Sequence, residues 1–232
     1  MGRDVIIACD FESKERLLEF LDPFEGKSLY LKVGMELFYA AGPDIIREIK
    51  KRGHKIFLDL KLHDIPTTVM KAMKVLSELD VDMCNLHASG TIAMMEAAIK
   101  GLTRPDGTRP LLIAVTQLTS TNQERMEQDL LIKEPIDKVV MHYASNAKAA
   151  GLDGVVCSAQ EAQKVHDTCG KEFLTVTPGI RFADSAADDQ VRIMTPEKAK
   201  SVGSDYIVVG RPITAADDPV AAYERCVREF VD

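Results

Sequence analysis

The sequence predicts a TIM barrel, in which eight parallel strands form a closed sheet inside a ring of helices. Eight short apolar runs recur along the chain, each followed by a segment with helical signals. The runs are almost continuously apolar, which is typical of parallel strands buried on both faces. The expected strands are Val5–Cys9, Leu29–Val33, Lys55–Asp59, Met83–His87, Leu111–Val115, Gly154–Cys157, Phe173–Val176 and Tyr206–Val209. Eight such units in 232 residues favour a (β/α)8 barrel.

The chain is expected to form one domain over residues 1–232. No linker rich in proline, serine or glycine divides it, and no low-complexity segment is present. An open, doubly wound sheet is the alternative fold. The glycine-rich G-x-G-x-x-G pattern that often follows the first strand of such sheets is absent, which favours the barrel.

Several helix starts are marked by residues that cap free backbone N–H groups or by prolines that fit the first helical turn. These starts are expected at Pro43, Pro66, Thr121, Ser158, Thr195-Pro196 and Asp218-Pro219. Thr121 and Ser158 each precede a glutamate by three residues, the spacing of a capping box. The polar stretch 177–192 is the least regular and is predicted to form a mobile lid.

The composition excludes several classes of partner. The formal net charge of −7 disfavours binding to nucleic acid, whose phosphate backbone attracts basic surfaces. No apolar run reaches the roughly 18 residues of a membrane span, and the N-terminus has no signal segment. The five cysteines lack metal-site or redox-pair spacing, and reduced thiols suit the cytoplasm. The expected protein is cytoplasmic and globular.

Charged residues stand at or near the ends of most predicted strands, which is where TIM barrels carry their catalytic groups. They are Asp10, Lys32, Asp59, Lys61, His87, Arg181 and Arg211. One charge in such a place usually means only that the chain returns to water. A lone histidine is likewise more often structural, so neither His63 nor His87 is assigned a catalytic role.

The segment Asp59-Leu60-Lys61 is more informative. Residues two apart on a strand point the same way, so Asp59 and Lys61 should share one face. Opposite charges facing a barrel interior are costly unless they are paired, and Lys32 and Asp64 could extend the pair into a line. A buried ion-pair network that fixes strand register is the structural alternative. It is less favoured, because barrel interiors are usually filled by branched apolar side chains.

The end of the eighth strand predicts a phosphate site. Gly210 would let the backbone approach a ligand closely, and the neighbouring N–H groups and Arg211 could hold a phosphate. Many barrels bind phosphate after strands seven and eight. An ordinary turn with a surface arginine remains the alternative.

These motifs together resemble the orotidine 5′-monophosphate decarboxylase family in its bacterial form. The segment 59–68, which reads DLKLHDIPTT, is the most specific element of the resemblance. Further similar segments follow the same order as in the family: Ile7–Asp10, Leu31–Gly34, Ala114–Ser120, Val176–Arg181 and Val208–Arg211. The similarity runs from about residue 4 to the C-terminus.

The resemblance implies an enzyme that converts orotidine 5′-monophosphate to UMP and CO2 in pyrimidine biosynthesis. Lys61 would donate the proton to C6, and Lys32, Asp59, Lys61 and Asp64 would form a catalytic charge network. No metal and no organic cofactor are expected. The resemblance also implies a homodimer with shared active sites, in which Asp64, Ile65 and Thr68 reach into the site of the partner subunit.

The resemblance further assigns the substrate contacts. Asp10 and Lys32 would hold the ribose hydroxyl groups, and Thr119 would contact the pyrimidine. The phosphate would be bound by Arg181, Gln190, Gly210 and Arg211.

Two other functions compete with this one. A metal-dependent sugar-phosphate decarboxylase or synthase of the same barrel superfamily would share the Asp-x-Lys strand end but would need Mg²⁺. A non-catalytic nucleotide-binding barrel would bind UMP without turnover. The grouped charges Asp59, Lys61 and Asp64 argue against it, because buried charges without a task are costly.

Overall fold

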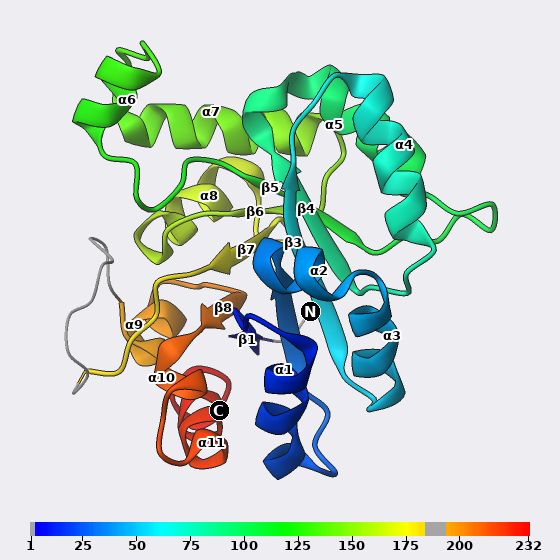
Figure 1. Ribbon diagram of the computed structural model, residues 1–232. Helices are drawn as coiled ribbons and strands as arrows, with labels where there is room; N and C mark the ends of the chain where they lie inside the picture. The colour runs from blue at the N-terminus through cyan, green and yellow to red at the C-terminus, as the bar shows by residue number, and fades with distance from the viewer. Residues whose placement is uncertain (1–2, 184–193) are drawn as a thin grey trace.

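The strands form a closed parallel barrel in the computed structural model, which describes residues 3–183 and 194–232. Their order is that of the chain, and β1 pairs with both β2 and β8 (Figure 1). The strands are β1 (Asp4–Ala8), β2 (Tyr30–Gly34), β3 (Lys55–Leu62), β4 (Met83–His87), β5 (Leu111–Val115), β6 (Gly154–Val156), β7 (Leu174–Thr177) and β8 (Tyr206–Val209). The predicted TIM barrel is therefore confirmed, and the open sheet is wrong.

The predicted strand limits agree closely with the structure, and β4, β5 and β8 match to the residue. The main difference is β3, which runs three residues beyond its predicted end at Asp59. Its pairing with β4 is irregular between Leu58 and Leu62, and Lys61 has a φ of 51° in the same stretch. This local irregularity lies at the mouth of the barrel.

Helices surround the barrel (Figure 1). They are α1 (Lys14–Leu21), α2 (Met35–Ala41), α3 (Asp44–Lys51), α4 (Pro66–Ser77), α5 (Thr91–Leu102), α6 (Gln123–Asp129), α7 (Ile136–Ala149), α8 (Ala162–Cys169), α9 (Pro196–Ser201), α10 (Arg211–Thr214) and α11 (Pro219–Phe230). Short 3-10 turns are η1 (Asp22–Phe24), η2 (Ala88–Gly90) and η3 (Ala159–Glu161). Within the two described ranges, no helix is long and apolar enough to cross a membrane.

Most of the predicted helix starts are confirmed. Thr195 and Asp218 cap α9 and α11, and Ser158 forms a capping box with Glu161 at the start of η3. The start predicted at Thr121 is wrong by one residue. Asn122 is the cap of α6, because its side chain accepts the N–H of Arg125 at 2.9 Å, whereas the N–H of Thr121 donates to Leu118 in the preceding turn.

Apolar side chains fill two regions on either side of the sheet. The larger cluster lies between the strands and the helices and includes Leu58 and Leu60 of β3. The smaller cluster fills the barrel interior, where Tyr30 and Tyr206 meet edge to face at the N-terminal ends of their strands. Because apolar and aromatic groups occupy the interior there, the polar groups of the barrel gather at the opposite, C-terminal mouth.

Candidate active site

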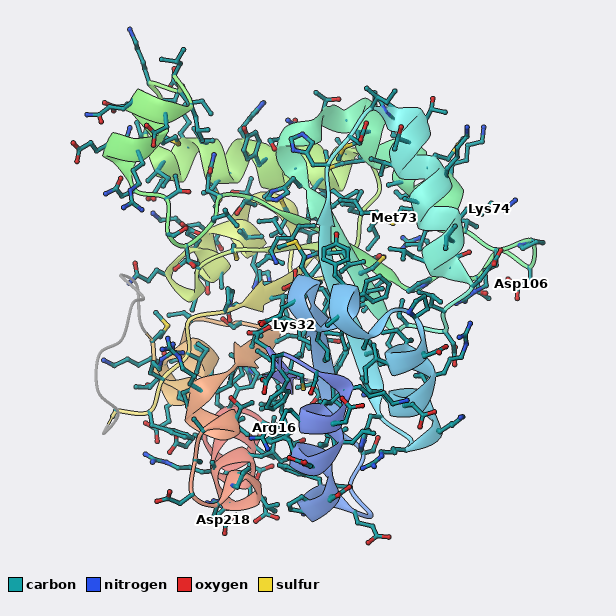
Figure 2. The ribbon with its side chains drawn as sticks, viewed as in Figure 1. Arg16, Lys32, Met73, Lys74, Asp106 and Asp218 are labelled. Atoms are coloured by element: carbon teal, nitrogen blue, oxygen red, sulfur yellow. The ribbon has the colours of Figure 1, made fainter. Side chains whose placement is uncertain are left out.

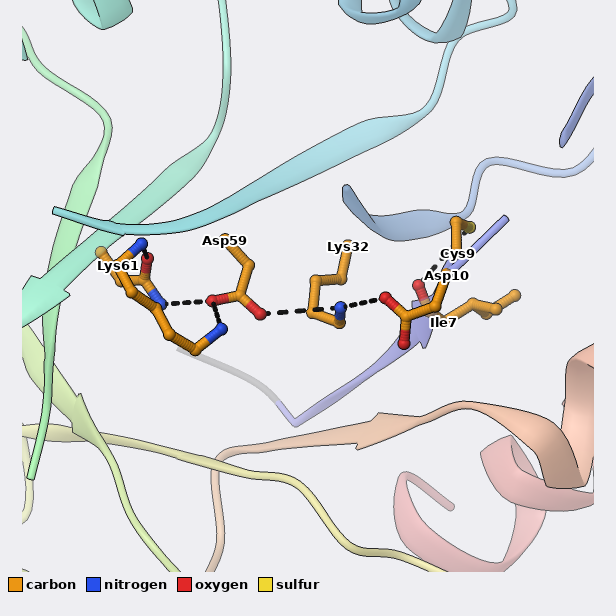
Figure 3. A network of polar contacts seen from close by, with 7 residues as sticks. Ile7, Cys9, Asp10, Lys32, Asp59 and Lys61 are labelled. Carbon is orange, nitrogen blue, oxygen red and sulfur yellow. Dashed lines mark hydrogen bonds and ion pairs between the residues drawn. The ribbon is translucent and has the colours of Figure 1, made fainter. Parts of the chain in front are cut away.

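A line of alternating charges crosses the mouth of the barrel from β1 to β3 (Figure 3). The Lys32 Nζ lies 2.7 Å from Asp10 Oδ1 and 3.6 Å from Asp59 Oδ2. On the other side of the same carboxylate, Lys61 Nζ lies 2.6 Å from Asp59 Oδ1. The structure therefore confirms the predicted line of Lys32, Asp59 and Lys61 and adds Asp10 to its end. Figure 2 shows Lys32 near the middle of the molecule.

Strand β3 supplies Asp59 and Lys61, the last two members of this line. Leu58 and Leu60 pack into the outer apolar cluster, which leaves Asp59 on the inner face. Lys61 follows on the same side, but with its backbone in the left-handed region, which is uncommon for residues other than glycine. Its N–H donates to the Asn85 side chain at 2.8 Å. The Asp-x-Lys pair is thus formed on a distorted strand end.

The inner charges are nearly removed from water. The side chains of Lys32 and Asp59 are each 11% exposed, compared with 25% for Lys61 and 59% for Asp10. Burial alone would lower the pKa of Lys32, but the carboxylates of Asp10 and Asp59 outweigh it and raise that pKa. Burial would raise the pKa of Asp59, but Lys32 and Lys61 outweigh it and lower that pKa. Lys32 and Asp59 are therefore both held in their charged forms.

Asn85 of β4 is bonded to two members of the network, and the sequence reasoning did not identify it. Its Nδ2 donates to Asp59 Oδ1 at 2.7 Å while its Oδ1 accepts the Lys61 N–H. The side chain is buried, with 1% exposure. The one available signal was a lone amide in an apolar strand, two residues before His87 and so on the same face.

A cavity of about 150 Å³ opens beside the charges. Lys32, Asp59, Lys61 and Thr119 line it, which brings the residue expected to contact the pyrimidine next to the charge network. Its apolar wall includes Phe57, Val115, Val156 and Val208. Ligand pockets usually measure at least roughly 300 Å³, so the described residues enclose only part of a ligand-sized site.

The residues expected to bind phosphate follow β7 and β8, which are neighbours in the barrel. Arg181 is buried; its Nη1 donates to the Ile180 carbonyl at 2.8 Å, and its Nε has no hydrogen-bond partner within the described ranges. Gly210 follows β8, and Arg211 begins α10 with an exposed side chain. Gln190 lies outside the described residues, as does most of the predicted lid.

The loop between β3 and α4, together with the first turn of α4, carries the residues expected to reach a partner subunit. Asp64, Ile65 and Thr68 are exposed, and Ile65 is 66% exposed. Asp64 Oδ1 accepts the N–H of Ile65 at 2.7 Å, so within one chain Asp64 points to its own loop. The predicted extension of the charge line to Asp64 is not formed within this chain.

Two histidines lie beside the site. The rings of His63 and His87 are 5.7 Å apart. Burial, followed by the nearby His63 and Lys61, lowers the pKa of His87, which favours its neutral form. In the described part of the chain, no group of three or more His, Cys, Asp or Glu side chains is arranged to hold a metal ion.

Comparison with known proteins agrees with this geometry. The model of the orotidine 5'-phosphate decarboxylase / HUMPS family matches residues 3–226. Orotidine 5'-phosphate decarboxylase of Geobacillus thermodenitrificans is 55% identical, over 99% of this chain and 98% of its own. The enzyme of the same name from Bacillus caldolyticus is 56% identical, over 99% of this chain and 96% of its own.

Solved structures give the same result. The crystal structure of orotidine 5'-phosphate decarboxylase from Lactobacillus acidophilus has a TM-score of 0.88 and 42% identity, with all of both chains covered. A conserved protein from Geobacillus kaustophilus has a TM-score of 0.87 and 48% identity, with 97% of this chain and 99% of that one covered. This chain belongs to the orotidine 5'-phosphate decarboxylase / HUMPS family.

Proposed function

We propose that the chain converts orotidine 5′-monophosphate to UMP and CO2, with Lys61 as the group that protonates C6 of the pyrimidine. The decarboxylase activity and its place in pyrimidine biosynthesis follow from the family and from relatives that match the chain over its full length. The observation that supports Lys61 is its position. Lys61 lines the cavity at the barrel mouth, and its Nζ lies 2.6 Å from Asp59 Oδ1.

The chemistry requires a cation at this place. Loss of CO2 leaves an electron pair in the plane of the ring, where the π system cannot delocalise it. A fixed ammonium next to C6 stabilises this charge as it develops and then supplies the proton. Lys61 is held by Asp59 and through its own backbone by Asn85, so it is positioned before the substrate binds.

Asp59 and Lys32 are proposed to act next to Lys61 at the reacting carbon. The carboxylate of Asp59 stays ionised because two lysines flank it, and it would stand close to the carboxylate that leaves. Repulsion between these like charges would favour the loss of CO2. Lys32, with Asp10, would bind the ribose hydroxyl groups next to this centre.

The remaining contacts of the substrate are proposed from the family to which the chain belongs. Thr119 would contact the pyrimidine from the cavity wall, and Arg181, Gln190, Gly210 and Arg211 would bind the phosphate. Phosphate binding has a catalytic purpose here. Each tenfold gain in rate needs about 1.4 kcal/mol, and one ammonium cannot supply the whole acceleration. Remote binding energy would help to organise the site.

The active unit is proposed to be a homodimer with shared sites. Asp64, Ile65 and Thr68 are exposed on the β3–α4 loop and the first turn of α4, and their side chains would enter the site of the partner subunit. There Asp64 would complete the charge network. The proposed location is the cytoplasm, where the five unpaired cysteines would remain reduced.

The test is a spectrophotometric assay with orotidine 5′-monophosphate in excess chelator, with wild type beside Lys61→Ala. We expect the wild type to turn over without added metal and the variant to lose decarboxylation while keeping its fold. Turnover that disappears with chelator would favour the metal-dependent alternative. UMP binding without turnover by the wild type would favour the non-catalytic barrel.

A further inference from the structure

We propose that Asn85 is a positioning residue for the decarboxylation, which holds the Lys61 backbone and the Asp59 carboxylate in their reactive arrangement. This inference rests on the proposed function of Lys61. It comes from the two hydrogen bonds that the buried Asn85 amide makes to β3, one to each of the two residues.

The first bond fixes the backbone of Lys61. A φ of 51° is costly for a residue with a side chain, and such a conformation persists only where the surroundings hold it. Here the pairing of β3 with β4 is irregular, between Leu58 and Leu62. The Lys61 N–H instead donates to Asn85 Oδ1 at 2.8 Å. Asn85 therefore stabilises the turn of the backbone that directs the lysine side chain.

The second bond fixes the carboxylate. Asn85 Nδ2 donates to Asp59 Oδ1 at 2.7 Å, the same oxygen that accepts Lys61 Nζ at 2.6 Å. A donor to an ionised carboxylate favours the charged form, and this bond is one of the causes of the lowered pKa of Asp59. It also orients the carboxylate relative to the ammonium.

Only one orientation of the Asn85 amide satisfies both neighbours, with its oxygen toward Lys61 and its nitrogen toward Asp59. A leucine of similar size can make neither bond. An ionised aspartate can accept from the Lys61 N–H but cannot donate to Asp59. A protonated aspartic acid can do both. Comparing these side chains at position 85 therefore distinguishes a positioning role of Asn85 from one in which it only fills space.

The main experiment compares Asn85→Leu with Cys84→Ala. Cys84 is the residue before Asn85 on β4, is as buried as Asn85 and belongs to the cluster that faces the helices. The Cys84→Ala variant therefore controls for a general loss of packing. We expect Asn85→Leu to lower kcat about 10- to 100-fold, the range for losing hydrogen bonds that involve charged groups, with KM for orotidine 5′-monophosphate nearly unchanged. Cys84→Ala should keep kcat, whatever its thermal stability.

A second variant gives a readout that a purely structural role would not change. In Asn85→Asp, the new carboxyl group faces Asp59 and Lys61 of β3, with Lys32 beyond them on β2 and His87 on its own strand. The neighbours on β5, Ile113 and Val115, are apolar. We expect the kcat of this variant, divided by that of wild type at each pH, to rise as the pH falls and the new group becomes protonated. The variant remains informative if Asn85→Leu does not fold.

The outcomes separate this inference from the function on which it rests. Loss of turnover in Lys61→Ala, together with a kcat for Asn85→Leu equal to that of Cys84→Ala, would overturn the role of Asn85 alone. A change confined to KM, or a pH-independent ratio for Asn85→Asp, would also overturn it. Native-like turnover by Lys61→Ala would overturn both proposals.

Discussion

Replacing Asp59 by asparagine removes the central negative charge of the site with little change in shape. The carboxylate lies between two ammonium groups, 2.6 Å from Lys61 Nζ and 3.6 Å from Lys32 Nζ, and its side chain is 11% exposed. Breaking a buried ion pair usually costs about 3–5 kcal/mol, because the remaining charge is left uncompensated.

Two features of the site reduce that cost. Lys32 keeps Asp10 at 2.7 Å, and the Lys61 side chain is 25% exposed, so water can solvate part of it. We therefore expect Asp59→Asn to lower the free energy of unfolding by about 2–3 kcal/mol at neutral pH. For a chain of this size, the melting temperature should fall by roughly 4–12 °C.

The contribution of Asp59 to the free energy of unfolding should depend on pH. The pKa of Asp59 is lower in the folded protein than its ordinary value, so its stabilisation is complete above the unfolded value of about 3.9. It is lost as the pH falls through the folded value. Urea denaturation of wild type and Asp59→Asn over a series of pH values measures this. The reasoning would be refuted if the variant were as stable as wild type at neutral pH. It would also be refuted if the difference in free energy of unfolding between the two proteins grew as the pH fell.

Three further changes test other parts of the site. In Gly34→Ala the new Cβ would lie 3.1 Å from Asp10 Oδ1 and 3.2 Å from Lys32 Nζ, so it would displace this ion pair. Steady-state kinetics should then show a KM several-fold higher. An unchanged KM would mean that the Asp10–Lys32 pair does not bind the substrate. Orotidine, which is the substrate without its phosphate, should be turned over with a lower kcat, not merely a higher KM, because remote binding energy is missing; equal kcat values for the two substrates would contradict this. Ile65→Asp places a charge on an exposed side chain of the proposed interface, so sedimentation should show monomers and the assay should show little activity. An active monomer would contradict the proposal that the sites are shared between subunits.

The sequence predicted the barrel because its strands carry a simple signal. Strands buried on both faces are short and continuously apolar, and the helix starts at Thr195 and Asp218 carry cap residues followed by proline. The end of β3 was predicted too early, because charged residues there interrupt the apolar run. The observed continuation depends on the left-handed backbone at Lys61, which no local pattern indicates.

The site could be predicted where its residues stand at strand ends. Asp10, Lys32, Asp59 and Lys61 were selected in this way, and the structure brings them into one line. Asn85 could not be selected, because a lone amide in an apolar strand acquires its role only through the register of β4 against β3. The role of Asp64 depends on a second chain, and within one chain its carboxylate accepts from its own loop.

The account depends most on where the Lys61 ammonium lies relative to the reacting carbon. A crystal structure of the protein with bound UMP measures this directly. We predict that Lys61 Nζ lies about 3–3.5 Å from C6 of the pyrimidine, the separation expected for reacting atoms, with the Asp59 carboxylate beside it. A structure in which this amine points into solvent, or in which another proton donor is closest to C6, would contradict the proposed chemistry.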